Sequence, residues 1–367
     1  MAGIRSFLRR EPVFLISVIA AVISCFFVPP DAEYLGYIDF RTLALLYSLM
    51  IVVAGLRKAG AFEALANTLC ARAGSTRIIG IMLTCLCFFS SMLITNDVAL
   101  LTFVPFSVIV LHMAGRDQDL IRVIVLQTVA ANLGSMLTPV GNPQNLYLYS
   151  HYNIPFGEFL GMTFPIWGIS LFLLLGCCFL LPRAHLRPLT GEKAKIGYRS
   201  LWLYLALFAV CLLTVVRVLS WPILLVVILL VLLILDRKML LRADFMLLLT
   251  FVAFFVFAGN LARIHAGKEL LRTLLSGREY LTSLLASQVI SNVPAALLLS
   301  NFTENAKMLV RGVNIGGLGT PIASLASLIS LKLYTRTENA RTGKFLLEFT
   351  LFNAALLLLL SLFHLLV

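Results

Sequence analysis

The stretch LITNDVALLTFVP, residues 93–105, places Asn96 and Asp97 within a segment that is otherwise almost wholly apolar. An ionised aspartate at the centre of a bilayer costs about 2.5–3.5 kcal/mol even on the insertion scales that give the lowest penalties. Such a pair therefore needs either a place at the membrane surface or a role in a buried, hydrated site. The rest of the sequence bears on which of these two interpretations applies.

The composition is that of a membrane protein. Of the 367 residues, 60% are hydrophobic and 13% are charged, and the mean hydropathy is +0.98. Soluble domains are closer to half apolar and a quarter charged. Because a helical span takes about 20 residues, the length predicts about nine or ten spans with short loops and no soluble domain. The seven cysteines lie in or beside apolar runs and are interpreted as packing residues.

The positive charge predicts an orientation in the membrane. The net charge is +12, and most of the 29 Lys and Arg residues fall in alternate loops between apolar runs. Cytoplasmic loops are enriched in these residues. The pattern therefore predicts a multi-pass protein of the cell inner (cytoplasmic) membrane with its N-terminus in the cytoplasm. It makes the lipid bilayer, and not nucleic acid, the partner of the basic residues.

The order of the apolar runs repeats. A pair of spans, an amphipathic stretch, two short arms with an Asn at the bend, a crossing broken by Gly and Pro, and a closing span occur twice. Each set makes an even number of crossings, so one extra span between them turns the second set upside down. The sequence thus predicts an all-α polytopic membrane protein with two inverted-topology repeats. The repeats are 1–182 and 222–367, joined by a cytoplasmic loop and linking span at 183–221.

Each predicted repeat contains two unusual parts. The arms at 78–112 and 280–303 are at the short end for full spans, which suggests re-entrant helical hairpins. The crossings at 122–150 and 308–331 carry Gly and Pro residues that no continuous helix accommodates. Unwound backbone at membrane depth is tolerated only where it is buried in protein or lines a water-filled cavity. The alternative interpretation is that 78–112 forms two ordinary spans joined by a polar turn at the surface.

The point where the two arms of 78–112 or of 280–303 meet is called a bend, and the Gly- and Pro-containing interruption of 122–150 or of 308–331 is called a break. Polar residues at the two bends and the two breaks form the candidate site. The predicted substrate-binding residues are Thr95, Asn96, Thr138, Asn142, Asn145, Ser291, Asn292, Asn314, Thr320 and Ser324. The predicted ion-coupling residues are Asp97, Asn96, Asn292, Gly141 and Gly317, with Na⁺ considered at Asn96, Asp97 and Gly141. Each polar side chain has the competing interpretation of a helix cap or a packing residue. Apart from Na⁺, no cofactor and no structural metal is expected, because the five histidines are widely separated.

Asp97 has three interpretations. Ionised, its carboxylate would ligate Na⁺ directly. Buried, it would have a raised affinity for protons and would carry a proton through a transport cycle. It would also serve as a cap for the helix that follows from Val98. The sequence does not choose among these three roles.

Four stretches resemble signature sequences of the ion transporter superfamily: ITNDVALLTFVP, NLGSMLTPVGNPQN, SNVPAALLL and GVNIGGLGTPIASLASL. The last is most similar to the citrate-transporter and arsenite-permease branch; the divalent anion:sodium symporters are more distant. In the dicarboxylate branch each hairpin tip carries Ser-Asn-Thr, which holds substrate carboxylates and Na⁺. Both asparagines match here, but Asp97 and Val293 depart from that pattern. The resemblance also implies a homodimer with an elevator-like motion.

These observations predict a secondary active transporter and not an enzyme. The expected substrate is a small anion or oxyanion, carboxylate-like or arsenite-like, coupled to Na⁺ or H⁺ by alternating access. The alternative is a cation antiporter of the Na⁺/H⁺ type, in which both ions share Asp97. A more distant alternative is an ion channel. A protease is disfavoured, because the chain has no HExxH motif and no evident Ser–His pairing within the spans.

Overall fold

The computed structural model describes residues 12–70, 74–184, 196–338 and 340–366. Every secondary-structure element within these ranges is a helix. Seven of the described helices are long and apolar enough to cross a membrane, and three shorter ones are also apolar. The prediction of an all-α polytopic membrane protein is confirmed.

The helices of the first half follow the apolar runs of the sequence. They are α2 (Pro12–Phe27), α3 (Tyr34–Tyr37), α4 (Phe40–Lys58), α5 (Ala61–Cys70), α6 (Thr76–Ile94), α7 (Asn96–Met113), η1 (Asp117–Asp119), α8 (Leu120–Ser135), η2 (Pro139–Gly141), α9 (Pro143–His151) and α10 (Phe156–Cys178). Polar caps fix several starts: the side chain of Asp39 accepts a hydrogen bond from the backbone N–H of Thr42 at 3.0 Å at the start of α4.

The second half follows the same plan after α11 (Tyr198–Val215) and α12 (Trp221–Leu235). Its remaining elements are η3 (Arg237–Leu241), α13 (Phe245–Arg263), α14 (His265–Leu275), α15 (Glu279–Ile290), α16 (Asn292–Leu299), η4 (Ser300–Phe302), α17 (Ala306–Ile315), α18 (Leu325–Tyr334) and α19 (Thr342–His364). Asp244 caps α13 by accepting from the backbone N–H of Leu247 at 3.0 Å.

Single residues form both bends. Thr95 alone separates α6 from α7, and Ser291 alone separates α15 from α16. Their φ/ψ values are 68/148° and 75/153°, a region that residues with side chains rarely adopt. Each bend thus falls within its predicted polar stretch, 94–97 or 290–294, and Asn96 and Asn292 begin the second arms.

The two pairs of arms differ in length. α6 and α7 have 19 and 18 residues and qualify as spans, whereas α15 and α16 have 12 and 8 residues. At 1.5 Å per residue, the shorter arms extend only about 18 and 12 Å. The first arms are longer than the sequence indicated, because α6 starts at Thr76, where Ser75 caps the helix.

Both predicted broken crossings are interrupted. The first helix stops at Ser135 and restarts at Pro143; the second stops at Ile315 and restarts at Leu325. Proline removes a backbone donor and fixes φ, which favours a first-turn position at a restart and disfavours a helix interior. Each interruption therefore leaves a short stretch outside the α-helices, with η2 as one 3-10 turn in the first. Side-chain amides bind several of its backbone carbonyls: Asn145 donates to Met136 and Gln288 donates to Leu318.

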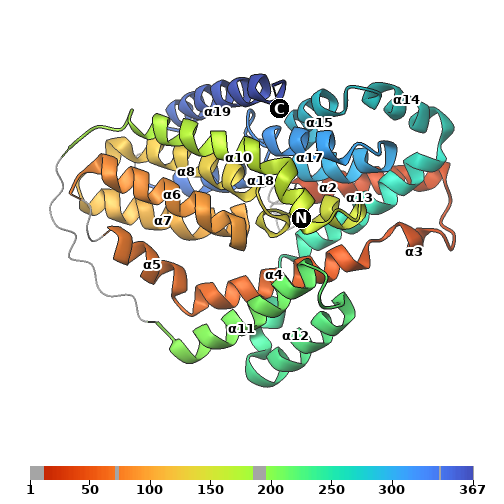
Figure 1. Cartoon of the computed structure of the whole chain (residues 1–367), viewed down its shortest axis with the longest axis horizontal. Coiled ribbons are helices and arrows are strands. Elements are labelled where there is room, and N and C mark those ends of the chain that lie inside the picture. Colours follow the sequence, from red (N-terminus) through yellow and green to blue (C-terminus); the bar gives the residue numbers. More distant parts are fainter. Residues whose placement is uncertain (1–11, 71–73, 185–195, 339, 367) are drawn as a thin grey trace, which may run out of the picture.

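The helices form two groups that meet at these interruptions (Figure 1). In the first group, α8 packs against α6, α7, α10, α18 and α19. In the second, α4 packs against α11 and α12, and α13 packs against α2 and α16. The first break contributes to both apolar cores, with Met136 in the first and Val140 in the second, and Leu318 of the second break lies in the first core.

Candidate functional site

The two breaks are joined directly by side-chain amides. Asn142 Nδ2 donates to Asn314 Oδ1 at 3.2 Å, and Asn314 Nδ2 donates to Asn145 Oδ1 at 2.7 Å. These three side chains are at most 3% exposed. Asn142 also caps α9, because its Oδ1 accepts from the backbone N–H of Asn145 at 2.9 Å. A buried polar group needs such partners, since an unpaired one costs about 1–3 kcal/mol.

A second set of contacts joins the first bend to the second break through Asn132. Asn132 Oδ1 accepts from Asn96 Nδ2 at 3.2 Å and from Ser324 Oγ at 2.9 Å. Its own Nδ2 donates to the Gly317 carbonyl oxygen at 3.4 Å. Asn132 lies on α8 and was not among the predicted site residues. Its side chain links Asn96 at the first bend to Ser324 and Gly317 at the second break.

The threonines of the breaks tie each break to its own bend. Thr138 Oγ1 donates to the carbonyl oxygen of Met92, and Thr320 Oγ1 donates to that of Gln288 at 3.1 Å. Each acceptor lies three residues before its bend residue, Thr95 or Ser291. The two halves therefore repeat the same contact at equivalent positions.

A repeat in the sequence could have revealed Asn132. NLGSMLTP at 132–139 and NIGGLGTP at 314–321 share Asn, Gly, Thr and Pro at the same spacing. Aligning the two breaks would have paired Asn132 with Asn314. The bends can be compared in the same way: SMLITN at 91–96 aligns with SQVISN at 287–292, which pairs Ser91 with Ser287. The bends and the breaks therefore both repeat between the two halves of the chain.

The predicted glycines permit close approach. A Cβ at Gly317 would lie 2.9 Å from Asn292 Nδ2 and 3.2 Å from the Asn314 carbonyl oxygen. A Cβ at Gly141 would collide with the backbone carbonyl of Ser135. Neither glycine offers a side-chain ligand, so any role in ion binding would use backbone groups.

Within the described residues, the side chains of Asn292 and Asp97 lack hydrogen-bond partners. The Asn292 amide is 3% exposed and makes no hydrogen bond within the described residues, although its backbone N–H donates to the Ala323 carbonyl oxygen at 2.9 Å. Asp97 Oδ1 is buried and also has no partner in the described part of the chain. Both groups are free to bind something else.

The capping role considered for Asp97 is wrong. The cap position of α7 is Thr95, which makes no side-chain cap hydrogen bond. Asn96 Oδ1 instead accepts from the backbone N–H of Asp97 at 2.9 Å. Asn96 therefore supplies the local partner that Asp97 was expected to provide, and the Asp97 carboxylate is left for another purpose.

A cavity of about 230 Å³ adjoins the first bend. Three of the predicted residues line it: Thr95, Asp97 and Asn142. The charged residues that line it are Asp97, Arg57, Arg242 and Asp244, and the remaining wall is largely apolar. The other predicted residues do not line this cavity; all of them are buried except Thr320, which is exposed.

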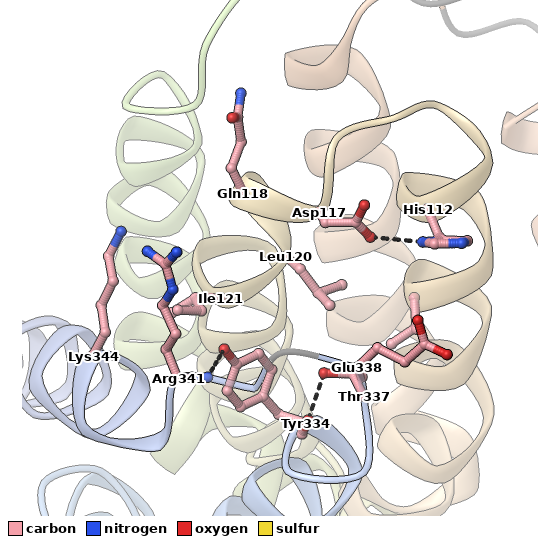
Figure 2. A pocket seen from close by; sticks show the side chains of 11 residues that line it. His112, Asp117, Gln118, Leu120, Ile121, Tyr334, Thr337, Glu338, Arg341 and Lys344 are labelled. Atoms are coloured by element: carbon pink, nitrogen blue, oxygen red, sulfur yellow. Dashed lines mark hydrogen bonds and ion pairs between the residues drawn. The ribbon is translucent and has the colours of Figure 1, made fainter.

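A larger cavity of about 440 Å³ lies elsewhere, between the end of α7, the start of α8 and the segment after α18 (Figure 2). His112 Nδ1 and Asp117 Oδ1 lie 3.0 Å apart on one side, and Arg341 and Lys344 lie on another. None of the predicted site residues lines it. It brings together two segments from the two halves of the chain, 117–121 and 334–344.

Known proteins of similar sequence are membrane proteins. Residues 4–307 match the family model described as citrate transporter. The inner membrane protein YbiR of Escherichia coli is 31% identical over 335 residues, covering 89% of this chain and 88% of that protein. An uncharacterized transporter of Methanocaldococcus jannaschii is 35% identical over 320 residues, covering 86% of each chain. The silicon efflux transporter LSI3 of rice is 32% identical over 143 residues, covering 38% of this chain and 29% of that protein.

The fold and these similarities together define a multi-pass membrane protein of the transporter class. The chain belongs to the citrate transporter family, because the family model covers more than half of its length. The resemblance to the ion transporter superfamily noted in the sequence is thereby confirmed.

Proposed function

We propose that the protein is a secondary active transporter that moves a small anion or oxyanion across the inner membrane, coupled to Na⁺ or H⁺. One observation carries this proposal: two interrupted helices from distant parts of the chain meet through Asn142 and Asn314, beside two single-residue bends. Interrupted helices of this kind place half-helix ends and free carbonyls around substrate and ions in transporters.

The polar groups present suit such a role. The buried amides of the site are neutral, so they bind oxygen-rich ligands through donors and acceptors without a fixed charge. Asp97 adds one carboxylate that has no hydrogen-bond partner among the described residues, and it is a suitable ligand for Na⁺ or carrier for a proton. Gly141 and Gly317 would contribute backbone carbonyls to the same ions.

We also propose the architecture that this mechanism requires. The repeats would be 1–182 and 222–367 in inverted orientation, with 78–112 and 280–303 as re-entrant hairpins. The matching contacts of Thr138 with Met92 and Thr320 with Gln288 support the repeat. The short arms α15 and α16 favour a re-entrant second hairpin. A homodimer with an elevator-like motion is part of the proposal through family resemblance.

Uptake into proteoliposomes tests the proposal. Purified protein would be reconstituted with an imposed Na⁺ or pH gradient and supplied with citrate, other carboxylates, arsenite or silicate. We expect one of these to accumulate above its outside concentration, and only when the gradient is present. Equilibration without accumulation would indicate a channel.

A cation antiporter of the Na⁺/H⁺ type is the second candidate, and the pair of carboxylates in the cavity favours it. Asp97 and Asp244 line the same 230 Å³ cavity, and Asp97 Oδ1 is unpartnered within the described residues. Two carboxylates at one site can exchange a metal cation for protons. In the same vesicles an antiporter would change the internal pH when Na⁺ alone is added, without any anion.

A further inference from the structure

Arg57 occupies an unusual position in the cavity beside Asp97. It lies in the last turn of α4, is half-buried and lines the cavity. Its guanidinium Nη2 donates a hydrogen bond to the backbone carbonyl oxygen of Leu101 at 2.9 Å. Arg57 thus fixes its charged group against α7, the helix that begins at the first bend.

This hydrogen bond exists because α7 contains Pro105. In an α-helix the carbonyl of Leu101 would accept from the backbone N–H of residue 105, four positions later. Proline has no such N–H, so the carbonyl lacks its helical donor. Arg57 supplies the missing donor, and the residue it binds, Leu101, lies four residues or about 6 Å along the helix axis from Asp97.

The guanidinium of Arg57 makes no other hydrogen bond within the part of the chain that the structure describes. An arginine offers five N–H donors, and the Leu101 carbonyl uses one of them. Arg57 forms no ion pair within the described residues, whereas its neighbour Lys58 pairs with Asp236 at 2.8 Å. The cavity therefore has on its wall an immobilised cation with unused donors.

We propose that Arg57 recognises the charge of the transported anion, with its free donors binding the carboxylate or oxyanion oxygens. This inference deepens the proposed function and rests on it. A guanidinium suits the task because its planar donors match two oxygens of a carboxylate or oxyanion. Arg242 lines the same cavity, but its side chain is exposed and makes no hydrogen bond within the described residues, so it is not held in place.

The competing explanation is that Arg57 only completes the hydrogen bonding of α7. Pro105→Ala separates the two roles, because alanine restores the backbone N–H that the Leu101 carbonyl lacks. In that background the carbonyl no longer needs Arg57. Any remaining effect of changing Arg57 must then come from what its free donors bind.

The test measures anion uptake by the wild type, Pro105→Ala, Arg57→Gln and the double variant in proteoliposomes. We expect Arg57→Gln to raise KM for the anion by about tenfold or more, with a smaller effect on the maximal rate. The KM of the double variant should stay raised, because Pro105→Ala restores only the backbone hydrogen bond. Arg57→Lys should recover part of the affinity, since it keeps the charge but not the planar donors. Arg77→Gln is the matched control: Arg77 Nε also donates to a backbone carbonyl oxygen, that of Leu181 at 2.8 Å, but Arg77 does not line this cavity, so KM should stay within about threefold.

The outcomes distinguish the two proposals. If the double variant Pro105→Ala, Arg57→Gln has the KM of Pro105→Ala alone, the role of Arg57 is structural and the inference is overturned. If the wild type accumulates no anion of the panel under any gradient, the proposed function fails, and the inference fails with it. Melting temperatures of all variants in detergent confirm that each is folded.

Discussion

Asn142 and Asn314, 172 residues apart in the chain, share a hydrogen bond of 3.2 Å from Nδ2 of the first to Oδ1 of the second. It joins the interruption between α8 and α9 to that between α17 and α18. Both side chains are buried, so neither loses its partner to water without a penalty. The contact makes the two halves of the chain mutually dependent at their least regular points.

A double-mutant cycle measures this dependence. Asn142→Ala and Asn314→Ala should each lower the free energy of unfolding by about 1–3 kcal/mol, because each leaves buried amides unpaired. The double variant should lose less than the sum, with a coupling of about 1 kcal/mol. Asn353→Ala is the control: Asn353 is buried but bonds the carbonyl of Phe349 in its own helix, so its effect should add to that of Asn142→Ala. Strict additivity of both pairs would contradict the prediction.

The carboxylate of Asp97 should be dispensable for folding and required for coupling. Asp97→Asn removes the charge at nearly constant volume and breaks no hydrogen bond, since the Asp97 carboxylate accepts none within the described residues. We expect an unchanged or higher melting temperature and the loss of gradient-driven accumulation. Asp244→Asn should keep both properties, because asparagine also caps a helix. Full coupled uptake by Asp97→Asn would remove Asp97 from the mechanism.

Cysteine labelling tests the inverted hairpins. In a background without Cys25, Cys70, Cys85, Cys87, Cys177, Cys178 and Cys211, single cysteines would replace Thr95 or Ser291. We expect small aqueous thiol reagents to reach the two positions from opposite sides of the membrane. Labelling of both positions from one side, in every condition, would argue for two ordinary span pairs.

Gly134 should tolerate no side chain. A Cβ there would collide with the backbone carbonyl oxygen of Phe88, and α8 packs closely against α6 at this point. Gly134→Ala should lower the free energy of unfolding by about 1–3 kcal/mol. Gly168→Ala, on α10, meets nothing within 4 Å and should raise it by about 0.5–1 kcal/mol through helix propensity. Equal melting temperatures for the two variants would refute the prediction.

The ion pair at the end of α4 predicts a pH dependence. Hydrogen bonds from Lys58 and Tyr204 hold the pKa of Asp236 below its ordinary value of 3.8. A lowered pKa stabilises the fold above the ordinary value, and this contribution is lost as the pH falls through the lowered pKa. Lys58→Met should therefore lower the free energy of unfolding by about 0–1 kcal/mol at pH 7 and by less at pH 3. The measurement is the melting temperature of both proteins at the two pH values. An effect that grows on acidification would contradict this sign.

The helices and their interruptions were predictable from the sequence because both depend on local properties. Runs of apolar residues set the helices, and Pro139 and Pro321 mark the breaks. The bends lie within the predicted stretches 94–97 and 290–294, but the sequence did not single out Thr95 and Ser291 as the residues with positive φ, because neither residue type favours it.

The contacts between the halves were not predictable in the same way. Asn132 lies within an otherwise apolar stretch of α8, and its role depends on Ser324 being brought beside it from 192 residues away. The bond from Arg57 to Leu101 likewise requires the relative placement of α4 and α7. Only comparison of the two breaks with each other carried a signal for Asn132.

The backbone at Thr95 and Ser291 has a consequence for the choice of residue at both positions. Their φ/ψ values fall where glycine is at ease and a side chain costs about 1–3 kcal/mol. Replacing either hydroxyl residue by glycine would relieve that penalty and make the chain easier to fold. The Ser291 hydroxyl offsets part of this penalty by donating to the Ala323 carbonyl oxygen at 3.4 Å. The Thr95 hydroxyl has no such partner within the described residues and lines the cavity instead, so folding alone does not account for the threonine.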